Sequence, residues 1–230
     1  MQILYEDNHL IAVAKAVGEI VQGDKTGDPT LIDAVKSYIK EHYNKPGEVF
    51  LGLPHRLDRP TSGVVLFART SKALTRLNDM FRSHEQIKKT YWAITAVCPK
   101  ESEATLEHYL IRREEENKSY VARPDRNGRY PEQAKRAVLS YKVIAHSDRY
   151  HLLEVKLLTG RHHQIRCQLA AIGCPIKGDL KYGAPRSNPD GGISLHARSL
   201  SFIHPVSRQP VIITAPVPDD ALWHALTASL

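Results

Sequence analysis

The sequence predicts an α+β fold with a mixed, mostly antiparallel sheet flanked by helices. Apolar runs typical of strands outnumber helical patterns, and the two do not alternate strictly, which disfavours a doubly wound parallel sheet. The composition is that of a globular protein, with 42% hydrophobic and 25% charged residues in 230. Because no repeat or linker-like segment interrupts the chain, we expect one domain over residues 1–230.

A hairpin and a helix are the first predicted elements. Apolar runs at residues 3–5 and 10–14 flank a polar turn, which is typical of a hairpin. A helix should follow over residues 31–42, because Thr30 and Asp33 have the spacing of a capping box. The face of this helix that should be buried consists of Leu31, Ala34, Val35 and Ile39.

The middle of the chain should contain a buried strand, another helix and further strands. Residues 63–68 form a continuous apolar run typical of a buried strand. A helix should follow over about residues 72–82, capped by Ser71, with Leu74, Leu77 and Phe81 facing inward. Further strands are predicted at residues 90–97, 137–144 and 150–158, with an exposed strand and loop region at 111–136.

Positive charge is concentrated in two segments of the chain. The whole sequence has 32 Lys and Arg against 25 Asp and Glu, a formal net charge of +7. Residues 55–91 and residues 151–208 each hold eight basic and three acidic side chains, so each segment has a net charge of +5. Many of these side chains are Arg, which suits bidentate contacts with phosphate. We therefore expect a nucleic-acid partner and an RNA-binding groove lined by both segments.

Cellular location and metal content are constrained by the same sequence. No run approaches the roughly 20 apolar residues that a membrane span needs, and the first residues lack the pattern of a signal peptide. Cys98, Cys167 and Cys174 have no metal-binding spacing and cannot all pair with one another, which suits a reducing cytoplasm. We expect a cytoplasmic protein without a membrane contact.

Residues 55–63, with the sequence His-Arg-Leu-Asp-Arg-Pro-Thr-Ser-Gly, precede the buried strand. The proline, serine and glycine predict a rigid turn that presents Asp58 at a strand edge. An isolated Asp would be a turn residue or a salt-bridge partner. Here three expected cations, His55, Arg56 and Arg59, surround it and should lower the pKa of its carboxyl group. An ionised carboxylate suits a nucleophile or a base.

Residues 158–166, Leu-Thr-Gly-Arg-His-His-Gln-Ile-Arg, begin a predicted helix that should stop at Gly173. Basic residues in the first turn of a helix oppose its dipole. Either an RNA phosphate or the Asp58 carboxylate at this helix start would explain them. His162 and His163 could otherwise be ordinary surface histidines, since no zinc-binding spacing includes them.

Residues 88–93, Lys-Lys-Thr-Tyr-Trp-Ala, should form a strand with Lys89, Tyr91 and Ala93 on one face. Tyr91 is either a core aromatic or, beside two lysines, a platform for a nucleobase. Such stacking is worth about 1–3 kcal/mol.

Together these segments resemble the RluA-type family of RNA pseudouridine synthases. The resemblance rests on His-Arg-Leu-Asp-x-x-Thr-Ser-Gly at residues 55–63, Lys-x-Tyr at 89–91 and Leu-Thr-Gly-Arg-x-His-Gln-Ile-Arg at 158–166. Later elements include Gly-Cys-Pro-Ile at 173–176 and Leu-His-Ala at 195–197. Two positions depart from the pattern: Ala16 replaces a proline in the early Lys-Pro-x-Gly element, and His162 replaces the usual threonine.

The resemblance implies a pseudouridine synthase fold with a central RNA-binding active-site cleft, and isomerisation of uridine to pseudouridine in ribosomal or transfer RNA. No redox change or group transfer occurs, so no cofactor or metal is expected, and no obligatory protein partner is apparent. The family's frequent N-terminal S4 domain is not expected either, because matching sequence begins near residue 2.

The resemblance also implies roles for individual residues. Asp58 would be the essential carboxylate, acting as nucleophile at C1′ or as base at C2′. Arg166, the second catalytic residue, would pair with Asp58 and keep it charged. Tyr91, the third, would lie against the target base and assist late proton removal at C5. The base would leave its stack, and Arg56 would fill the vacated space. The expected substrate-binding residues are His55, Arg56, Arg59, Thr61, Lys89, Arg161, His163, Gln164, Ile165 and Leu195.

Two rival functions use similar residues. A non-catalytic RNA-binding module would have no need of a carboxylate in a basic loop, where it repels phosphate. A glycoside or nucleoside hydrolase typically uses two carboxylates or a metal. The matched segments offer Asp58 without a clear second carboxylate, because Asp179 is by resemblance a structural turn residue.

Overall fold

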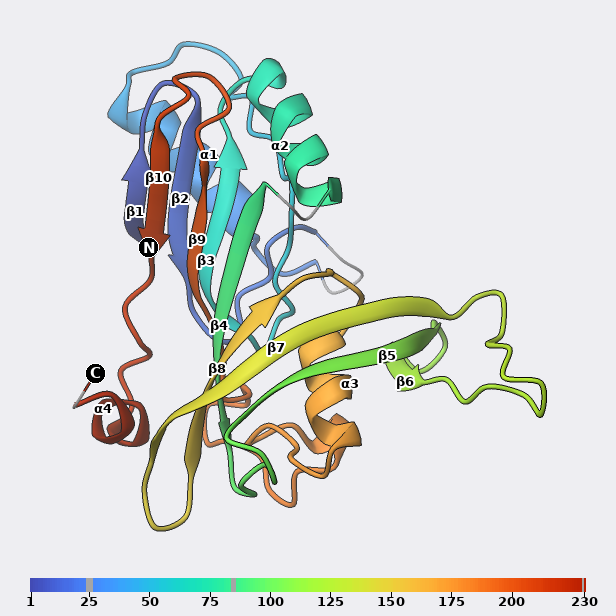
Figure 1. The fold of residues 1–230 in the computed structure, drawn as a ribbon. Helices are drawn as coiled ribbons and strands as arrows, with labels where there is room; N and C mark the ends of the chain where they lie inside the picture. Colours follow the sequence, from blue (N-terminus) through green and yellow to red (C-terminus); the bar gives the residue numbers. More distant parts are fainter. Residues whose placement is uncertain (24–26, 84–85, 229) are drawn as a thin grey trace. The chain divides into compact units, whose positions relative to one another are not determined.

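The computed structural model describes residues 1–23, 27–83, 86–228 and 230 (Figure 1). The chain forms two compact units, which consist of Met1–Lys89 with His196–Pro218 and of Thr90–Leu195 with Asp219–Leu230. Strands mostly pair antiparallel and helices accompany them in both units, so the predicted α+β class is confirmed. That the whole chain acts as a single catalytic domain stays a prediction.

The first unit is built on a sheet with strand order β1-β2-β3-β9, and β10 also pairs with β9. The pairing of β3 with β9 is parallel, and the others are antiparallel. These strands are β1 (Gln2–Glu6), β2 (Leu10–Lys15), β3 (Ser62–Ala68), β9 (Leu195–Ile203) and β10 (Pro210–Thr214). The helices of this unit are α1 (Leu31–His42) and α2 (Ser71–Ser83).

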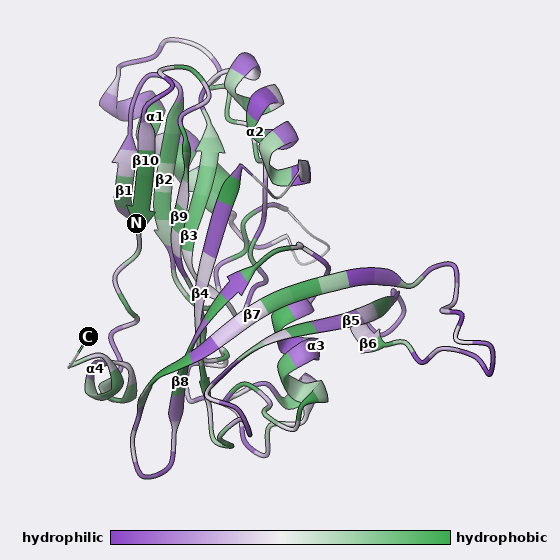
Figure 2. Ribbon diagram, in the orientation of Figure 1, coloured by the Kyte–Doolittle hydropathy of each residue, from purple (hydrophilic) through white to green (hydrophobic). Residues whose placement is uncertain are grey.

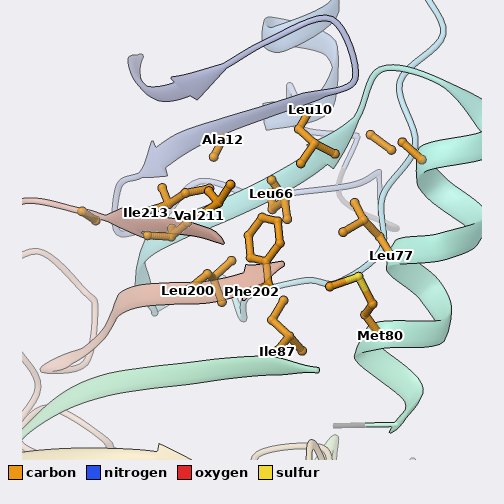
Figure 3. Close-up of a cluster of buried hydrophobic side chains, with 14 residues drawn as sticks. Leu10, Ala12, Leu66, Leu77, Met80, Ile87, Leu200, Phe202, Val211 and Ile213 are labelled. Atoms are coloured by element: carbon orange, nitrogen blue, oxygen red, sulfur yellow. The ribbon is translucent and has the colours of Figure 1, made fainter. Parts of the chain in front are cut away.

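Apolar side chains of α2 pack against this sheet and form the core of the first unit (Figure 3). Ala73, Leu77 and Met80 are the buried residues of the helix. They meet side chains from β2, β3, β9 and β10, which include Leu10, Leu66, Phe202 and Ile213. Strand β3 is buried along its whole length, as its continuous apolar run predicts.

The second unit has the strand order β4-β8-β7-β5-β6. Strand β5 pairs antiparallel with β6 and with β7, and β7 pairs antiparallel with β8. The strands are β4 (Ile87–Thr95), which begins in the first unit, β5 (Glu103–Arg113), β6 (Lys118–Val121), β7 (Lys135–His146) and β8 (His151–Leu157). The helical elements are α3 (Gln164–Ala171), the 3-10 turn η1 (Leu180–Tyr182) and α4 (Ala221–Thr227).

Hydropathy distinguishes the strands of the two units. Figure 2 shows β2 and β3 as mainly hydrophobic, whereas β7 alternates between hydrophobic and hydrophilic residues along its length. Strand β5 is mostly exposed or half-buried, and its first part is not predicted from the sequence, although Ala104, Leu106 and Leu110 alternate with more polar residues and pack in the cores of this unit. Among the described residues, no helix is long and apolar enough to cross a membrane.

Helix α1 has the predicted bounds, and Thr30 caps it by accepting a hydrogen bond from the N–H of Asp33 at 3.2 Å. Its buried residues are Leu31, Val35 and Ile39, whereas Ala34 is exposed, so the prediction for Ala34 is wrong. The three buried residues are spaced four positions apart and form a narrow apolar stripe along α1. Ala34 lies beside this stripe and reaches solvent.

The cap of α2 also differs from the prediction. Thr70, rather than Ser71, accepts a hydrogen bond from the N–H of Ala73, at 3.2 Å. Leu77 faces inward as expected, but Leu74 and Phe81 are only half-buried. The shift follows from the earlier start of the helix at Ser71, which puts the residue before it in the capping position.

Gly63 allows β3 and β9 to approach closely. Its φ of +119° is in the region that favours glycine, and it pairs with Ala197 across the parallel strands. A Cβ atom at this position would lie 2.3 Å from the carbonyl oxygen and 2.6 Å from the nitrogen of Ala197. Both are main-chain atoms of a paired strand, so they cannot move aside without breaking the pairing.

We predict that Gly63→Ala lowers the free energy of unfolding by about 2–5 kcal/mol, from backbone strain and steric overlap. Urea denaturation measures this loss. Gly27→Ala is the matched control, because Gly27 has a φ of +74° but open space around its Cβ position. It should cost only about 1 kcal/mol. Equal losses in the two variants would show that close approach to Ala197 is unimportant.

Candidate active site

Asp58 lies half-buried in the short loop that leads into β3. The N–H of Thr61 donates to the carbonyl oxygen of Asp58 at 3.0 Å and closes a turn. Leu57 is buried next to it, while Arg56 and Arg59 are exposed on either side. The loop thus turns directly before β3, with Leu57 buried beneath it and its two arginine side chains in solvent.

A buried lysine that sequence reasoning missed holds this loop. The ammonium group of Lys15, at the end of β2, donates to the carbonyl oxygens of Ala16 at 3.0 Å, Arg59 at 3.1 Å and Thr61 at 2.7 Å. Burial lowers the pKa of Lys15 to about 8, and the negative charges of Glu19 and Asp58 oppose that decrease. The available signal was a lysine that directly ends the apolar run at residues 10–14.

Ala16, which replaces a proline of the family pattern, makes a hydrogen bond that stabilises its turn. The N–H of Ala16 donates to the carboxylate of Glu19 at 2.7 Å, a bond that proline could not make. Nearby, the N–H of Gly18 donates to the carbonyl oxygen of Arg59 at 3.0 Å. The end of β2 is thus tied to the Asp58 loop by Lys15 and Gly18, and this short turn is held by Glu19 in place of a proline ring.

His55 is not one of the cations that the sequence predicts around Asp58. Its Nε2 atom accepts a hydrogen bond from the N–H of Leu66 at 2.9 Å, which requires that this nitrogen carry no proton. Burial, followed by the charge of Lys89, lowers the pKa of His55 to about 3. The ring stacks on Phe81, with 4.6 Å between centroids. His55 is therefore a neutral packing residue of the first unit.

The other predicted residues of this unit differ in exposure. Arg59 pairs with Asp28 at 3.0 Å, and both side chains are about half exposed. Lys89 is buried, and burial lowers its pKa to about 8. Thr61 is also buried, whereas Arg56 is accessible to a ligand.

Two sequence motifs meet where β3 pairs with β9. Ser62, in the Thr-Ser-Gly motif, has its hydroxyl oxygen 2.9 Å from Nδ1 of His196, in the Leu-His-Ala motif. His196 is buried, and burial lowers its pKa to about 4. Together with Gly63, these residues fix the register of the parallel pair, so both motifs have a structural role in addition to any catalytic one.

In the second unit, Gln164 organises the turn before α3. Its side-chain oxygen accepts hydrogen bonds from the hydroxyl of Thr159 at 2.7 Å and from the N–H of Arg161 at 2.9 Å. Its amide nitrogen donates to the carbonyl oxygen of Val138 at 3.0 Å. Arg161 itself extends to the carbonyl oxygen of Arg136 at 3.0 Å. Gln164 thus binds β7 to the helix start through a buried side chain.

Arg166 forms a buried, bidentate ion pair with Asp179. Its Nε and Nη2 atoms lie 2.7 Å and 2.8 Å from the two carboxylate oxygens. The side chains are 6% and 1% exposed, so neither charge is stabilised by bulk water. Asp179 lies in a turn, as the resemblance implies. Its carboxylate also pairs with a basic residue in the first turn of α3, where the sequence predicts an RNA phosphate or Asp58. That Arg166 pairs with Asp58 stays a prediction.

Three of the predicted residues gather in the apolar core of the second unit. Ile165 and Leu195 are buried members of this cluster, and Tyr91 packs against it while half-buried. The predicted site residues are thus divided by unit. Asp58, its basic neighbours and Lys89 belong to the first unit, and the residues from α3, together with Tyr91 and Leu195, belong to the second.

The described residues include no group of three or more His, Cys, Asp or Glu side chains that could hold a metal ion. All three cysteines are free thiols, with Cys98 exposed and the other two buried.

Comparison with known proteins gives the class of the protein. A family described as RNA pseudouridylate synthase matches residues 9–171. Ribosomal large subunit pseudouridine synthase D of Xanthomonas campestris is 32% identical, over 96% of this chain and 67% of its own. The tRNA pseudouridine synthase C of Vibrio cholerae is also 32% identical, over 98% of this chain and 94% of its own.

A solved structure agrees with these relatives. Human RNA pseudouridylate synthase domain containing 4 has a TM-score of 0.79 and 27% identity, and the likeness covers 95% of this chain and 89% of the human one. The chain therefore belongs to the RNA pseudouridylate synthases, and within them to the RluA type. It is an isomerase that converts uridine in RNA to pseudouridine, as the resemblance implies.

We predict that Asp179→Asn destabilises the protein by about 3–5 kcal/mol, because it leaves the charge of Arg166 buried without its carboxylate. Urea denaturation measures the change. Glu107→Gln is a matched control, since Glu107 makes a bidentate pair with Arg136 at 2.7 Å but both side chains are about half exposed. Its effect should be small. A similar loss in both variants would contradict the role of burial.

A pH dependence of stability follows from the neutral histidines. Burial lowers the pKa of His55, His163 and His196 to about 3, 2 and 4, below the ordinary value of about 6.5. The unfolded chain therefore binds protons first as the pH falls, so their stabilising effect is complete above pH ~6.5 and lost below it. Each residue should contribute a slope of at most about 1.4 kcal/mol per pH unit between pH ~6 and ~4.

Urea denaturation of wild type and His55→Gln at several pH values tests this dependence. The variant should lose less stability than wild type between pH 6 and 5, and the two should run parallel between pH 7 and 8. Parallel curves over the whole range would mean that the pKa of His55 is the same in the folded and the unfolded chain.

Proposed function

We propose that this isomerase acts on uridines of ribosomal or transfer RNA, with Asp58 as its essential carboxylate. The relatives named for ribosomal and transfer RNA substrates support this class of substrate. In the reaction the glycosidic bond from N1 to C1′ breaks, the uracil turns, and C5 bonds to C1′. Atoms and electrons balance without a cofactor, in keeping with the expectation that none is needed.

The observation that most supports Asp58 is the way its loop is held. Lys15 binds the carbonyl oxygens of Arg59 and Thr61, which flank Asp58 on its C-terminal side. The turn from Asp58 to Thr61 and the bond from Gly18 to Arg59 fix the same segment. A carboxylate that attacks C1′, or removes a proton at C2′, must be held within a few tenths of an ångström of its target. Attack at C1′ and proton removal at C2′ are both compatible with a loop that is held in this way.

Arg166 is proposed to pair with Asp58 during the reaction and keep it ionised. The fixed position of the guanidinium group supports this role, because Asp179 holds two of its nitrogens at 2.7 Å and 2.8 Å. Asp179 occupies one edge of the guanidinium group, which leaves the other edge to face a second carboxylate.

Tyr91 is proposed to lie against the target base, with Ile165 and Leu195 as the apolar wall. Its half-buried ring beside those two buried side chains supports that assignment. Entry of the base requires that it leave its stack, at a cost of a few kcal/mol. Arg56 is proposed to fill the vacated space, and its exposed position beside the buried Leu57 supports this role.

The two basic segments are proposed to bind the RNA backbone, with no obligatory protein partner, in the cytoplasm. Each segment has a net charge of +5, and exposed guanidinium groups such as those of Arg56 and Arg59 are suited to phosphate. Free thiols at all three cysteines are compatible with a reducing compartment.

We predict that Asp58→Asn reduces pseudouridine formation by at least about 1,000-fold, while RNA affinity stays within a few fold of wild type. Release of tritium from transcripts labelled at C5 of uridine measures turnover, and filter binding of the same transcripts measures affinity. Both ribosomal and transfer RNA transcripts serve as substrates.

Asp148→Asn, at an exposed turn residue, is the matched control and should retain full turnover. Wild-type turnover by Asp58→Asn would exclude Asp58 as the essential carboxylate. Loss of both turnover and affinity, with an intact fold, would instead indicate that Asp58 contributes to RNA binding.

A further inference from the structure

His163 occupies an unusual position at the start of α3. It is the residue before the helix, it is buried, and its φ of +52° is in the left-handed region. A β-carbon makes this conformation costly, and glycine or asparagine is more common there. Its side chain does not cap the helix. The sequence predicts that His163 binds substrate, but a strained and buried histidine at this point requires another explanation.

Both ring nitrogens of His163 face polar groups of the same unit. Nε2 lies 3.1 Å from Nη1 of Arg166, and Nδ1 lies 3.0 Å from the hydroxyl oxygen of Tyr182. A guanidinium group can only donate hydrogen bonds, so Nε2 must be the acceptor. The neutral ring then carries its proton on Nδ1, which donates to Tyr182. Burial and the charge of Arg166 lower the pKa of His163 to about 2, in agreement with a neutral ring.

Tyr182 fixes the other side of the imidazole ring. Its hydroxyl oxygen also accepts a hydrogen bond from the N–H of Ser119, in β6, at 2.8 Å. The hydroxyl group therefore receives two donors, one from the main chain of a strand, and burial raises its pKa so that it stays protonated. Arg166 lies over the ring of Tyr182, with its Cζ atom 5.1 Å from the centroid.

These contacts determine the direction of the Arg166 guanidinium group. Asp179 takes the N–H of Nε and one N–H of Nη2, and His163 takes one N–H of Nη1. The ring of Tyr182 lies against its face. Asp179 alone would neutralise the charge, but it would allow the plane to rock about the carboxylate. With His163 in place, the edge formed by the other N–H groups of Nη1 and Nη2 points in one direction.

We propose that His163 is a positioning residue for the isomerisation: as a neutral imidazole with its proton on Nδ1, it orients Arg166 rather than contacting RNA. This proposal rests on the proposed role of Arg166 in the reaction. It explains why a histidine, with one acceptor and one donor nitrogen on a rigid ring, occupies a strained backbone position where a more flexible residue would cost less.

The test compares His163→Gly with wild type. Glycine relaxes the left-handed backbone and removes the ring, so the fold is preserved while the contact to Arg166 is lost. We expect kcat to fall by about 100-fold, the effect of misplacing a reacting group, with KM within threefold of wild type. Asn44→Gly, at another left-handed residue, in the first unit, is the matched control and should retain wild-type kcat.

Added imidazole should restore at least about a tenth of the lost kcat in His163→Gly, because it can occupy the space of the ring and supply both nitrogens. N-methylimidazole has no N–H to donate to Tyr182 and should restore less. His163→Asn is the second variant if His163→Gly is unstable. Asparagine accepts the left-handed backbone but cannot reach both partners, so we expect the same loss of kcat.

An increase in KM with unchanged kcat would overturn the proposal and support substrate binding by His163. A loss of kcat that imidazole does not restore would overturn it as well.

The protonation state of His163 provides a readout that does not depend on activity. In the wild-type protein without RNA, the nitrogen NMR shifts of the ring should identify a neutral imidazole with the proton on Nδ1 at neutral pH. A proton on Nε2, or a charged ring, would overturn the proposal. If the wild-type protein formed no pseudouridine in any RNA, the proposed function would fail, while this measurement would still decide whether His163 accepts from Arg166.

Discussion

The buried ion pair between Arg166 and Asp179 is the interaction on which the second unit depends most. Two charges that are almost completely removed from water are tolerated only when geometry and additional hydrogen bonds offset the cost of desolvation. Bidentate contact, the ring of Tyr182 and the acceptor nitrogen of His163 provide that compensation. Because Asp179 lies in the turn before η1, the pair also fixes that turn against α3.

Lys15 has a comparable role in the first unit. One ammonium group satisfies three carbonyl oxygens, and two of them belong to the loop that presents Asp58. In both units a buried cation with defined acceptors holds a segment from a proposed reaction site. This arrangement is stiff, because a buried charge that lost one of its acceptors would cost more than an exposed one. Stiffness is what a reaction that breaks and remakes a bond at one carbon atom requires.

Local signals account for the elements that the sequence predicts well. The capping pair of Thr30 and Asp33 determines where α1 begins, and the uninterrupted apolar run determines that β3 is buried. Adjacent hydroxyl residues are harder to distinguish, and Thr70 rather than Ser71 caps α2 because the helix begins one residue earlier. The first part of strand β5 is not predicted, although Ala104, Leu106 and Leu110 alternate with polar residues and pack in the cores of the second unit. Alanine is too small, and the alternation too short, to distinguish this half-exposed strand from a polar loop before its pairing with β7 is known.

The sequence by itself determined the class of the fold and the family, and it predicts the residues that are proposed to carry the chemistry. These depend on residue types at fixed spacings, which are local properties of the chain. Only the tertiary structure decided the charge state and partners of the buried polar groups. Lys15 binds carbonyl oxygens 44 and 46 positions away, and Arg166 meets a carboxylate 13 positions away. Whether His55 or His163 is charged depends on burial and on such distant partners, which no local pattern records.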